Sequence, residues 1–218
     1  PYVHAISEKF QSQVSLLVKK NSKADQLCSQ DPHIKEVLYL DRSQDNSGKH
    51  DGLLGFFKLL KEIKYKKFDK IFIFNGSLRF LLLAKLCGIQ SVLQYPLFIK
   101  KNNIVLTAKK FIENYTKSTI STQPKIYLNA TEVEKTKKKY FFDSNFKHVC
   151  VGFSASGPTK RWHIEKYIKL AEEINKKIPS KFYLAGGKND HDLFINFFNS
   201  SIAENCISFE NLTIQETL

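Results

Sequence analysis

Short apolar runs alternate with amphipathic segments along this chain, and the alternation constrains the fold more than any other feature. Several runs, such as Ile71-Phe72-Ile73-Phe74, are apolar throughout, which is typical of strands buried on both faces of a parallel sheet. The predicted strands cover residues 13–18, 37–40, 70–74, 91–95, 148–151, 182–185 and 206–209. The predicted helices cover residues 22–28, 53–65, 77–86, 103–115, 132–139, 165–174 and 190–199. Strands that alternate with helices predict an α/β fold with doubly wound parallel sheets.

The alternation is interrupted between residues 116 and 146, where a lysine-rich helix but no strong strand signal occurs. A chain of 218 residues is long enough for two small domains. We therefore expect a first domain at 1–118, an interdomain connection at 119–146 and a second domain at 147–218. The chain begins at Pro1 without a Met, and Thr213 with Glu216 has the pattern of a helix that has only begun. We expect the natural protein to continue beyond both ends.

The net charge of +13 raises the question of a polyanionic partner. Lys, Asn, Ile and Phe are abundant together, which indicates a compositional bias rather than a dedicated binding surface. The lysines at 61–70 and 135–139 fall on or beside predicted helices, where lysines commonly form a solvated face. These observations disfavour nucleic acid as a partner and favour an anionic membrane surface or an acidic glycolipid.

The sequence has no run of roughly 18 apolar residues that could span a bilayer, and no signal peptide is visible at its start. Its four cysteines are scattered and lack the spacing of a zinc site, which suits a reducing compartment. Cys150 and Cys206 lie in predicted strands and are expected in the core. The expected location is the cytoplasm.

A loop of small and hydroxyl residues at 152–162 joins one predicted strand to the following helix. Such a loop lets backbone amides approach an anion, and the helix N-terminus adds a positive dipole. Lys160 stands where the loop meets the helix and can neutralise a diphosphate, with Ser154, Ser156 and Thr159 as hydroxyl donors. In the alternative interpretation Lys160 is an ordinary surface lysine and the hydroxyl residues are helix N-caps.

Two glycines, Gly186 and Gly187, end the next predicted strand. In a parallel sheet they would lie beside the preceding loop and admit a nucleoside to the crevice, although they would equally suit a simple tight turn. Asp190 follows just beyond. Its carboxylate would either accept hydrogen bonds from ribose hydroxyls or stabilise the N-terminus of a helix.

Other motifs are absent or ambiguous. The loop lacks G-x-x-x-x-G-K-[ST], the glycine pair does not complete G-x-G-x-x-G, and the histidines show no metal-ligand spacing, so no metal is expected. Trp162 is expected to be a packing residue rather than a substrate platform. Arg161 either has a functional role beside Lys160 or only pairs with an acidic surface residue. Arg79, at the start of a predicted helix, is expected to face solvent rather than an acceptor.

The segments Gly157-Pro158-Thr159-Lys160-Arg161-Trp162 and Leu184-Ala185-Gly186-Gly187-Lys188-Asn189-Asp190 together resemble glycosyltransferase family 9, the bacterial lipopolysaccharide heptosyltransferases. The family pattern there is close to G-P-x-K-R-W-P, followed by a strand and G-G-x-x-[DE]. Residues 31–37, 67–71 and 77–79 are also similar to stretches of the family's first domain. Order and spacing are kept over most of the chain.

The resemblance implies a GT-B fold with two Rossmann-like domains, the second incomplete here. It implies transfer of a heptose or related sugar from an ADP-sugar donor to the lipopolysaccharide inner core, with inversion and without a metal or other cofactor. Lys160 would stabilise the leaving diphosphate. The donor nucleotide sugar would be bound by Ser154, Ser156, Thr159, Lys160, Gly186, Gly187 and Asp190. The acidic glycolipid acceptor implies peripheral contact with the cytoplasmic face of the inner membrane.

Three departures from the family pattern qualify what the resemblance implies. His163 stands where the family has Pro. The family's Gly-Asp segment, with the presumed general base, would precede Pro1, and its D-[ST]-G-x-x-H donor loop would follow Leu218. No base can therefore be named, and residues 1–218 alone are expected to be inactive. Two rivals stay open: another GT-B transferase with a different nucleotide sugar, and a noncatalytic basic module that binds polyanions.

Overall fold

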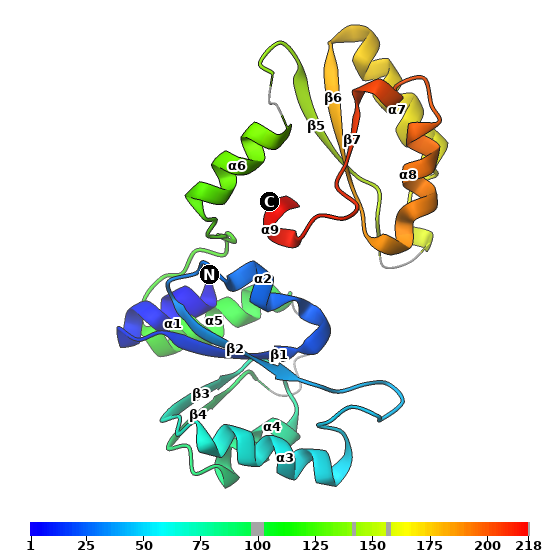
Figure 1. The fold of residues 1–218 in the computed structure, drawn as a ribbon. Coiled ribbons are helices and arrows are strands. Elements are labelled where there is room, and N and C mark those ends of the chain that lie inside the picture. The colour runs from blue at the N-terminus through cyan, green and yellow to red at the C-terminus, as the bar shows by residue number, and fades with distance from the viewer. Residues whose placement is uncertain (97–102, 141–142, 156–157, 218) are drawn as a thin grey trace. The chain divides into compact units, whose positions relative to one another are not determined.

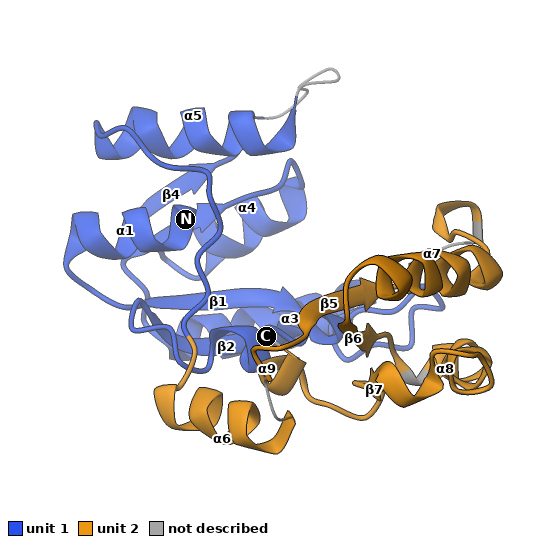
Figure 2. Ribbon diagram, turned by 90° about the horizontal axis from the view of Figure 1, so that it is seen from above, with its two compact units in different colours: residues 1–127 blue, residues 128–218 orange. Residues whose placement is uncertain are grey.

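The computed structural model describes residues 1–96, 103–140, 143–155 and 158–217. The chain divides into two compact units, Pro1–Tyr127 and Leu128–Leu218, which we call unit 1 and unit 2 (Figure 2). The boundary between them falls inside segment 119–146. The assignment of that segment as an interdomain connection stays a prediction.

Unit 1 is built from parallel strand pairs and helices (Figure 1). Strand β1 pairs with β2, and β3 pairs with β4, with Ile71 opposite Val92. Among the described residues no hydrogen-bonded ladder joins one pair to the other. The elements are α1 (Tyr2–Phe10), β1 (Val14–Lys19), α2 (Ala24–Cys28), β2 (Ile34–Leu40), α3 (Gly52–Tyr65), β3 (Lys70–Ile73), α4 (Leu78–Leu86), β4 (Ser91–Gln94) and α5 (Ile104–Thr116).

One apolar core connects both strand pairs of unit 1. Helix α3 contributes Phe56, Leu59 and Ile63, whose three- and four-residue spacing places them on one helix face. Leu83 and Ala84 of α4 are buried in the same core. Helices α3 and α4 therefore each bury one face in the same core, and the opposite face of each helix is exposed to solvent.

In its described residues, unit 2 contains one parallel sheet in the order β5-β6-β7 (Figure 1). The central strand β6 is the most deeply buried, and its Phe182 and Leu184 pack with Phe194 and Phe197 of α8. Because the strands are parallel, their carboxyl ends lie at one edge of the sheet. The elements are α6 (Ala130–Tyr140), β5 (Lys147–Gly152), α7 (Ile164–Lys177), β6 (Ser180–Ala185), α8 (His191–Phe198), β7 (Cys206–Ser208) and α9 (Ile214–Thr217).

The α/β class and the strand–helix order are confirmed, but two details differ from the sequence-based expectation. Helix α1 was not predicted; it buries Ile6 and Ser7 within a mixed polar sequence. Cys206 is buried as expected, whereas Cys150 is exposed. The reason is alternation along β5, which turns Val149 and Val151 toward the core and leaves Cys150 on the opposite side.

Within the described ranges, none of the helices combines the length and the apolar composition that a bilayer crossing requires.

Candidate functional site

The predicted loop leaves the carboxyl end of β5 and leads to α7. A 3-10 turn spans Pro158–Lys160, and α7 begins after the N-cap position His163. Ser154, Thr159 and Lys160 are exposed. Lys160 thus lies in a turn ahead of the helix rather than in its first turn. Ser156, also predicted to bind the donor, lies outside the described residues.

Asp190 is a buried carboxylate at the centre of this site, with only 3 % of the residue exposed. Its Oδ2 accepts a hydrogen bond of 2.9 Å from the amide of Gly187, and Arg161 Nη2 lies 3.2 Å from its Oδ1. Arg161 also donates from Nε and Nη2 to the carbonyl of Ala155, at 3.1 and 3.0 Å. Arg161 therefore ties the loop after β5 to the turn after β6.

Several groups together determine the charge state of Asp190. Burial by itself would raise the pKa of Asp190, but the Ser154 hydroxyl, the Gly187 amide and the Arg161 charge outweigh it and hold the pKa below its usual value. The expectation that Arg161 pairs with a surface acid is wrong in one respect, because its partner is buried. The hydrogen bonding of Asp190 to a ribose stays a prediction.

Packing beneath the turn after β6 explains one of its two glycines. A Cβ added to Gly186 would lie 2.9 Å from Cε2 of Phe153 and 3.1 Å from Cε2 of Phe194, and both rings are buried. A Cβ on Gly187 would meet only Asp190 Oδ2, at 3.7 Å, which is an ordinary contact. Gly186 is thus required by the aromatic packing, and admission of a nucleoside at this turn stays a prediction.

A histidine–carboxylate pair that the sequence did not reveal lies at the same edge of the sheet. His191 Nδ1 is 2.8 Å from Glu210 Oε1, and Glu210 follows the carboxyl end of β7. The signal for it was available, because an acidic residue directly after a predicted parallel strand must fall at the edge where the neighbouring strands end.

Trp162 packs locally rather than in the core. It is 46 % exposed, and its ring meets Tyr167 of α7 edge-on with centroids 5.1 Å apart. Lys166 Nζ lies 5.9 Å from the centre of the same ring. Trp162 therefore covers the first turn of α7 and leaves part of its ring open beside the loop.

Unit 1 contains a second buried carboxylate, in the polar loop between β2 and α3. Asp51 accepts hydrogen bonds from the amides of Ser43 and Gly48, at 2.9 and 3.0 Å, and from Arg42 Nε at 2.9 Å. These donors, the Ser43 amide foremost, lower the pKa of Asp51 to about 2. The loop is thus folded around a carboxylate that is ionised at neutral pH.

Arg79 holds the same loop from α4, and the expectation that it faces solvent is wrong. Its Nη2 donates to the carbonyls of His50 and Gly52, at 2.9 and 3.1 Å. The guanidinium also lies over the ring of Phe56, 5.2 Å from its centre. Arg79 lies in the first turn of α4 and Gly52 is the first residue of α3, so these hydrogen bonds join the amino ends of the two helices.

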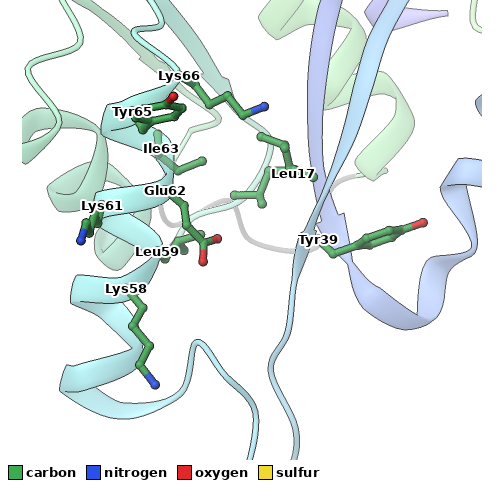
Figure 3. Close-up of a pocket in the computed structure, with 10 residues that line it drawn as sticks. Leu17, Tyr39, Lys58, Leu59, Lys61, Glu62, Ile63, Tyr65 and Lys66 are labelled. Atoms are coloured by element: carbon green, nitrogen blue, oxygen red, sulfur yellow. The ribbon is translucent and has the colours of Figure 1, made fainter.

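A groove of about 470 Å³ runs beside α3 in unit 1 (Figure 3). No predicted donor residue lines it, because all of those belong to unit 2. Its lining consists of Leu17, Leu38, Tyr39, Lys58, Leu59, Lys61, Glu62, Ile63, Tyr65 and Lys66. Across the described part of the chain, no three or more His, Cys, Asp or Glu side chains are placed to hold one metal ion.

Solved glycosyltransferase structures share this fold. The ADP-heptose lipopolysaccharide heptosyltransferase II of E. coli matches with a TM-score of 0.71 and 14% identity, over 99% of this chain and 69% of that chain. A family 9 glycosyl transferase of Veillonella parvula DSM 2008 matches with a TM-score of 0.68 and 15% identity, over 97% and 67%. The E. coli heptosyltransferase WaaC, solved with ADP, matches with a TM-score of 0.65 and 9% identity, over 99% and 72%.

No protein-family model and no curated protein matches this chain in sequence. The structural matches nevertheless extend over nearly all of it. The GT-B fold and the resemblance to family 9 structures, both expected from the Lys-Arg-Trp and Gly-Gly segments, are therefore confirmed.

Proposed function

We propose that this chain is part of a family 9 type glycosyltransferase, which moves a heptose or a related sugar from an ADP-sugar donor to the lipopolysaccharide inner core. The observation that carries the proposal is exposed Lys160, in the turn that precedes α7, at the carboxyl edge of a parallel sheet in a GT-B fold. This is the edge at which open α/β sheets bind nucleotides.

The proposed reaction requires a positive charge that stabilises the leaving diphosphate. The acceptor hydroxyl attacks the anomeric carbon from the face opposite the diphosphate, and the breaking C–O bond leaves its electrons on the departing ADP. We assign Lys160 to stabilise that diphosphate, helped by Ser154, Ser156, Thr159 and the amides at the start of α7. A lysine in this place does the work of a divalent cation, so the proposed transfer needs no metal or other cofactor.

Asp190 is assigned to the donor's nucleoside and sugar part. Its carboxylate is ionised, lies at the turn Gly186-Gly187 and is held by Arg161, so its position is fixed before a ligand arrives. The acceptor's general base is not assigned to any residue of this chain. The proposed acceptor is an acidic glycolipid, which suits the net charge of +13 and a place at the cytoplasmic face of the inner membrane.

Calorimetric titration of the purified chain with ADP and with UDP tests the proposal. ADP should bind more tightly than UDP, and Lys160→Ala should weaken ADP binding about ten- to a hundredfold, as expected for a lost charged contact to phosphate. Lys169→Ala is the matched control, because it removes another exposed lysine from the adjoining helix.

The rival interpretations give different results in the same titration. Tighter binding of UDP, still dependent on Lys160, would indicate a transferase with another nucleotide sugar. Binding of polyanions with a steep salt dependence and without preference for a nucleoside would contradict the transferase and favour a basic binding module.

A further inference from the structure

Helices α3 and α4 present an apolar surface to solvent. On α3, Leu54 and Tyr65 are 80 % and 85 % exposed, and Leu53 and Phe57 are also largely exposed. On α4, Leu78 is 62 % exposed and begins a row with Leu82 and Leu86, each one helical turn further on. These side chains lie opposite the faces that the two helices bury in the core of unit 1.

Lysines are interleaved with these apolar side chains. Lys58, Lys61 and Lys64 of α3 and Lys85 of α4 are exposed, and Lys58 and Lys61 project from α3 in Figure 3. In the described part of the chain none of the four lies within ion-pair distance of an acid. At 100° per residue, Leu53, Leu54, Phe57, Tyr65 and the lysines of α3 fall on one side of that helix.

The acidic residue of these helices does not cancel the charge. Glu62 is the only Asp or Glu in the sequences of α3 and α4. It lies 2.6 Å from Lys49 Nζ and 3.3 Å from His50 Nε2. The four lysines therefore form an uncompensated positive charge around the exposed leucines and aromatic rings.

The composition distinguishes between possible partners. Large exposed apolar patches mark protein or membrane contacts, and the fully buried centres of protein interfaces are depleted in lysine. Lysines among Leu, Phe and Tyr are instead typical of helices that lie in the interface of an anionic bilayer, where apolar side chains enter the headgroup region and ammonium groups meet lipid phosphates.

We propose that the outer surface of α3 and α4 docks unit 1 on an anionic phospholipid bilayer, with the helices lying along it. This α3–α4 outer surface consists of Leu53, Leu54, Phe57, Lys58, Lys61, Lys64, Tyr65, Leu78, Leu82, Lys85 and Leu86. The inference deepens the proposed membrane contact and rests on the proposed function only for the choice of membrane. The surface itself is defined by exposure and charge, independently of any nucleotide site.

Cosedimentation of residues 1–218 with phosphatidylglycerol vesicles and with phosphatidylcholine vesicles tests the surface. The chain should bind the anionic vesicles and not the neutral ones. In a variant with Lys58→Gln, Lys61→Gln and Lys64→Gln, the partition coefficient onto the anionic vesicles should fall about a hundredfold. Each lost lysine contributes about tenfold or less to this fall. The matched control, Lys135→Gln with Lys138→Gln and Lys139→Gln on α6, loses the same charge and should bind within about threefold of the parent.

A tryptophan reporter tests insertion separately from charge. Phe57→Trp combined with Trp162→Phe places the only Trp in the proposed surface, and its emission should shift to the blue and be quenched by brominated phosphatidylglycerol. The Trp162→Phe chain without the new Trp has none at all and gives the background signal. Leu53→Ser with Leu54→Ser changes only exposed positions and should reduce anionic-vesicle binding at least tenfold.

Equal losses in the α3 and α6 lysine variants, or an unquenched Trp at position 57, would overturn the proposal. Self-association in the absence of lipid that Leu53→Ser with Leu54→Ser abolishes would overturn it in favour of a second copy of the chain. ADP titration of the α3 lysine variant keeps the two proposals apart, because loss of vesicle binding with unchanged ADP affinity concerns this surface alone.

Discussion

At the scale of single residues, the edge of the unit 2 sheet shows why neighbouring glycines differ. Gly186 lies over the buried rings of Phe153 and Phe194, while Gly187 faces only the carboxylate of Asp190. The backbone of Gly187, with φ at −104°, suits any residue. The requirement for glycine therefore comes from side-chain packing at one position and is absent at the next.

Gly186→Ala should lower the free energy of unfolding of unit 2 by about 1–3 kcal/mol, because a methyl group cannot fit beside two buried aromatic rings without moving them. Gly187→Ala, the matched control, should change it by less than about 0.5 kcal/mol. Urea unfolding followed by the fluorescence of Trp162 measures both. Equal effects of the two substitutions would refute the packing explanation.

Asp51 gives unit 1 a pH dependence whose direction follows from its pKa. The pKa of Asp51 is lowered from 3.8 to about 2 in the folded chain, so the unfolded state takes up its proton first as the pH falls. The stabilisation from Asp51 is fully present above pH 3.8 and should be lost between that pH and about 2.

The unfolding midpoint in urea, measured by circular dichroism at several pH values, tests the contribution of Asp51. Asp51→Asn should be less stable than the parent at neutral pH, and the difference between the two chains should shrink as the pH falls toward 2. A difference that stays constant over this range would show that the ionised carboxylate contributes nothing specific.

At the scale of elements, the loop between β2 and α3 is held from outside by α4. Arg79→Ala removes two hydrogen bonds to carbonyls and the cover over Phe56, so the amides of Ser47, Gly48 and Asp51 should exchange with deuterium at least tenfold faster. Lys85→Ala on the same helix should leave them unchanged. Unaltered exchange in Arg79→Ala would mean that the Asp51 network alone orders the loop.

Elements with a local signal were predictable from the sequence. Apolar runs located every strand, and the predicted pair of Thr213 and Glu216 does cap α9: the Thr213 amide donates to Glu216 Oε2 at 2.9 Å, and the Glu216 amide donates to Thr213 Oγ1 at 3.2 Å. Helix α1 was missed although Tyr2, Ala5 and Ile6 recur at helical spacing and pack in one cluster, because a segment of nine residues gives only a short periodic signal. Two arginine contacts could not be predicted: that of Arg79 with the loop before α3, and that of Arg161 with Asp190. Both join segments that are distant in sequence.

The candidate site was predictable to a similar extent. Its loop, its lysine and its glycine turn follow from motif and strand order. The burial of Asp190 and its contacts with Arg161 and Gly187 depend on how two loops meet at the sheet edge. The His191–Glu210 pair depends on the same three-strand arrangement, which no single segment of sequence specifies.

At the scale of the whole molecule, the two units carry different features. Unit 2 holds the loop, the turn and the carboxylate assigned to the donor, whereas unit 1 holds the Asp51 loop and the α3–α4 outer surface. The positive charge of the chain therefore has two assigned roles. Lys160 is assigned to the donor diphosphate, and the lysines of α3 are assigned to a bilayer, and each assignment has its own test.

Hydrogen–deuterium exchange with and without saturating ADP tests whether ADP binds at the carboxyl edge of the unit 2 sheet. We expect slower exchange in peptides that cover 153–163 and 186–191 of unit 2, where bound ADP opposes local opening. Lys160→Ala should reduce the protection about ten- to a hundredfold at the same ADP concentration, in line with its weaker binding. Protection confined to unit 1, or no protection at the carboxyl edge of β5 and β6, would contradict the assignment of this edge as the nucleotide-sugar site.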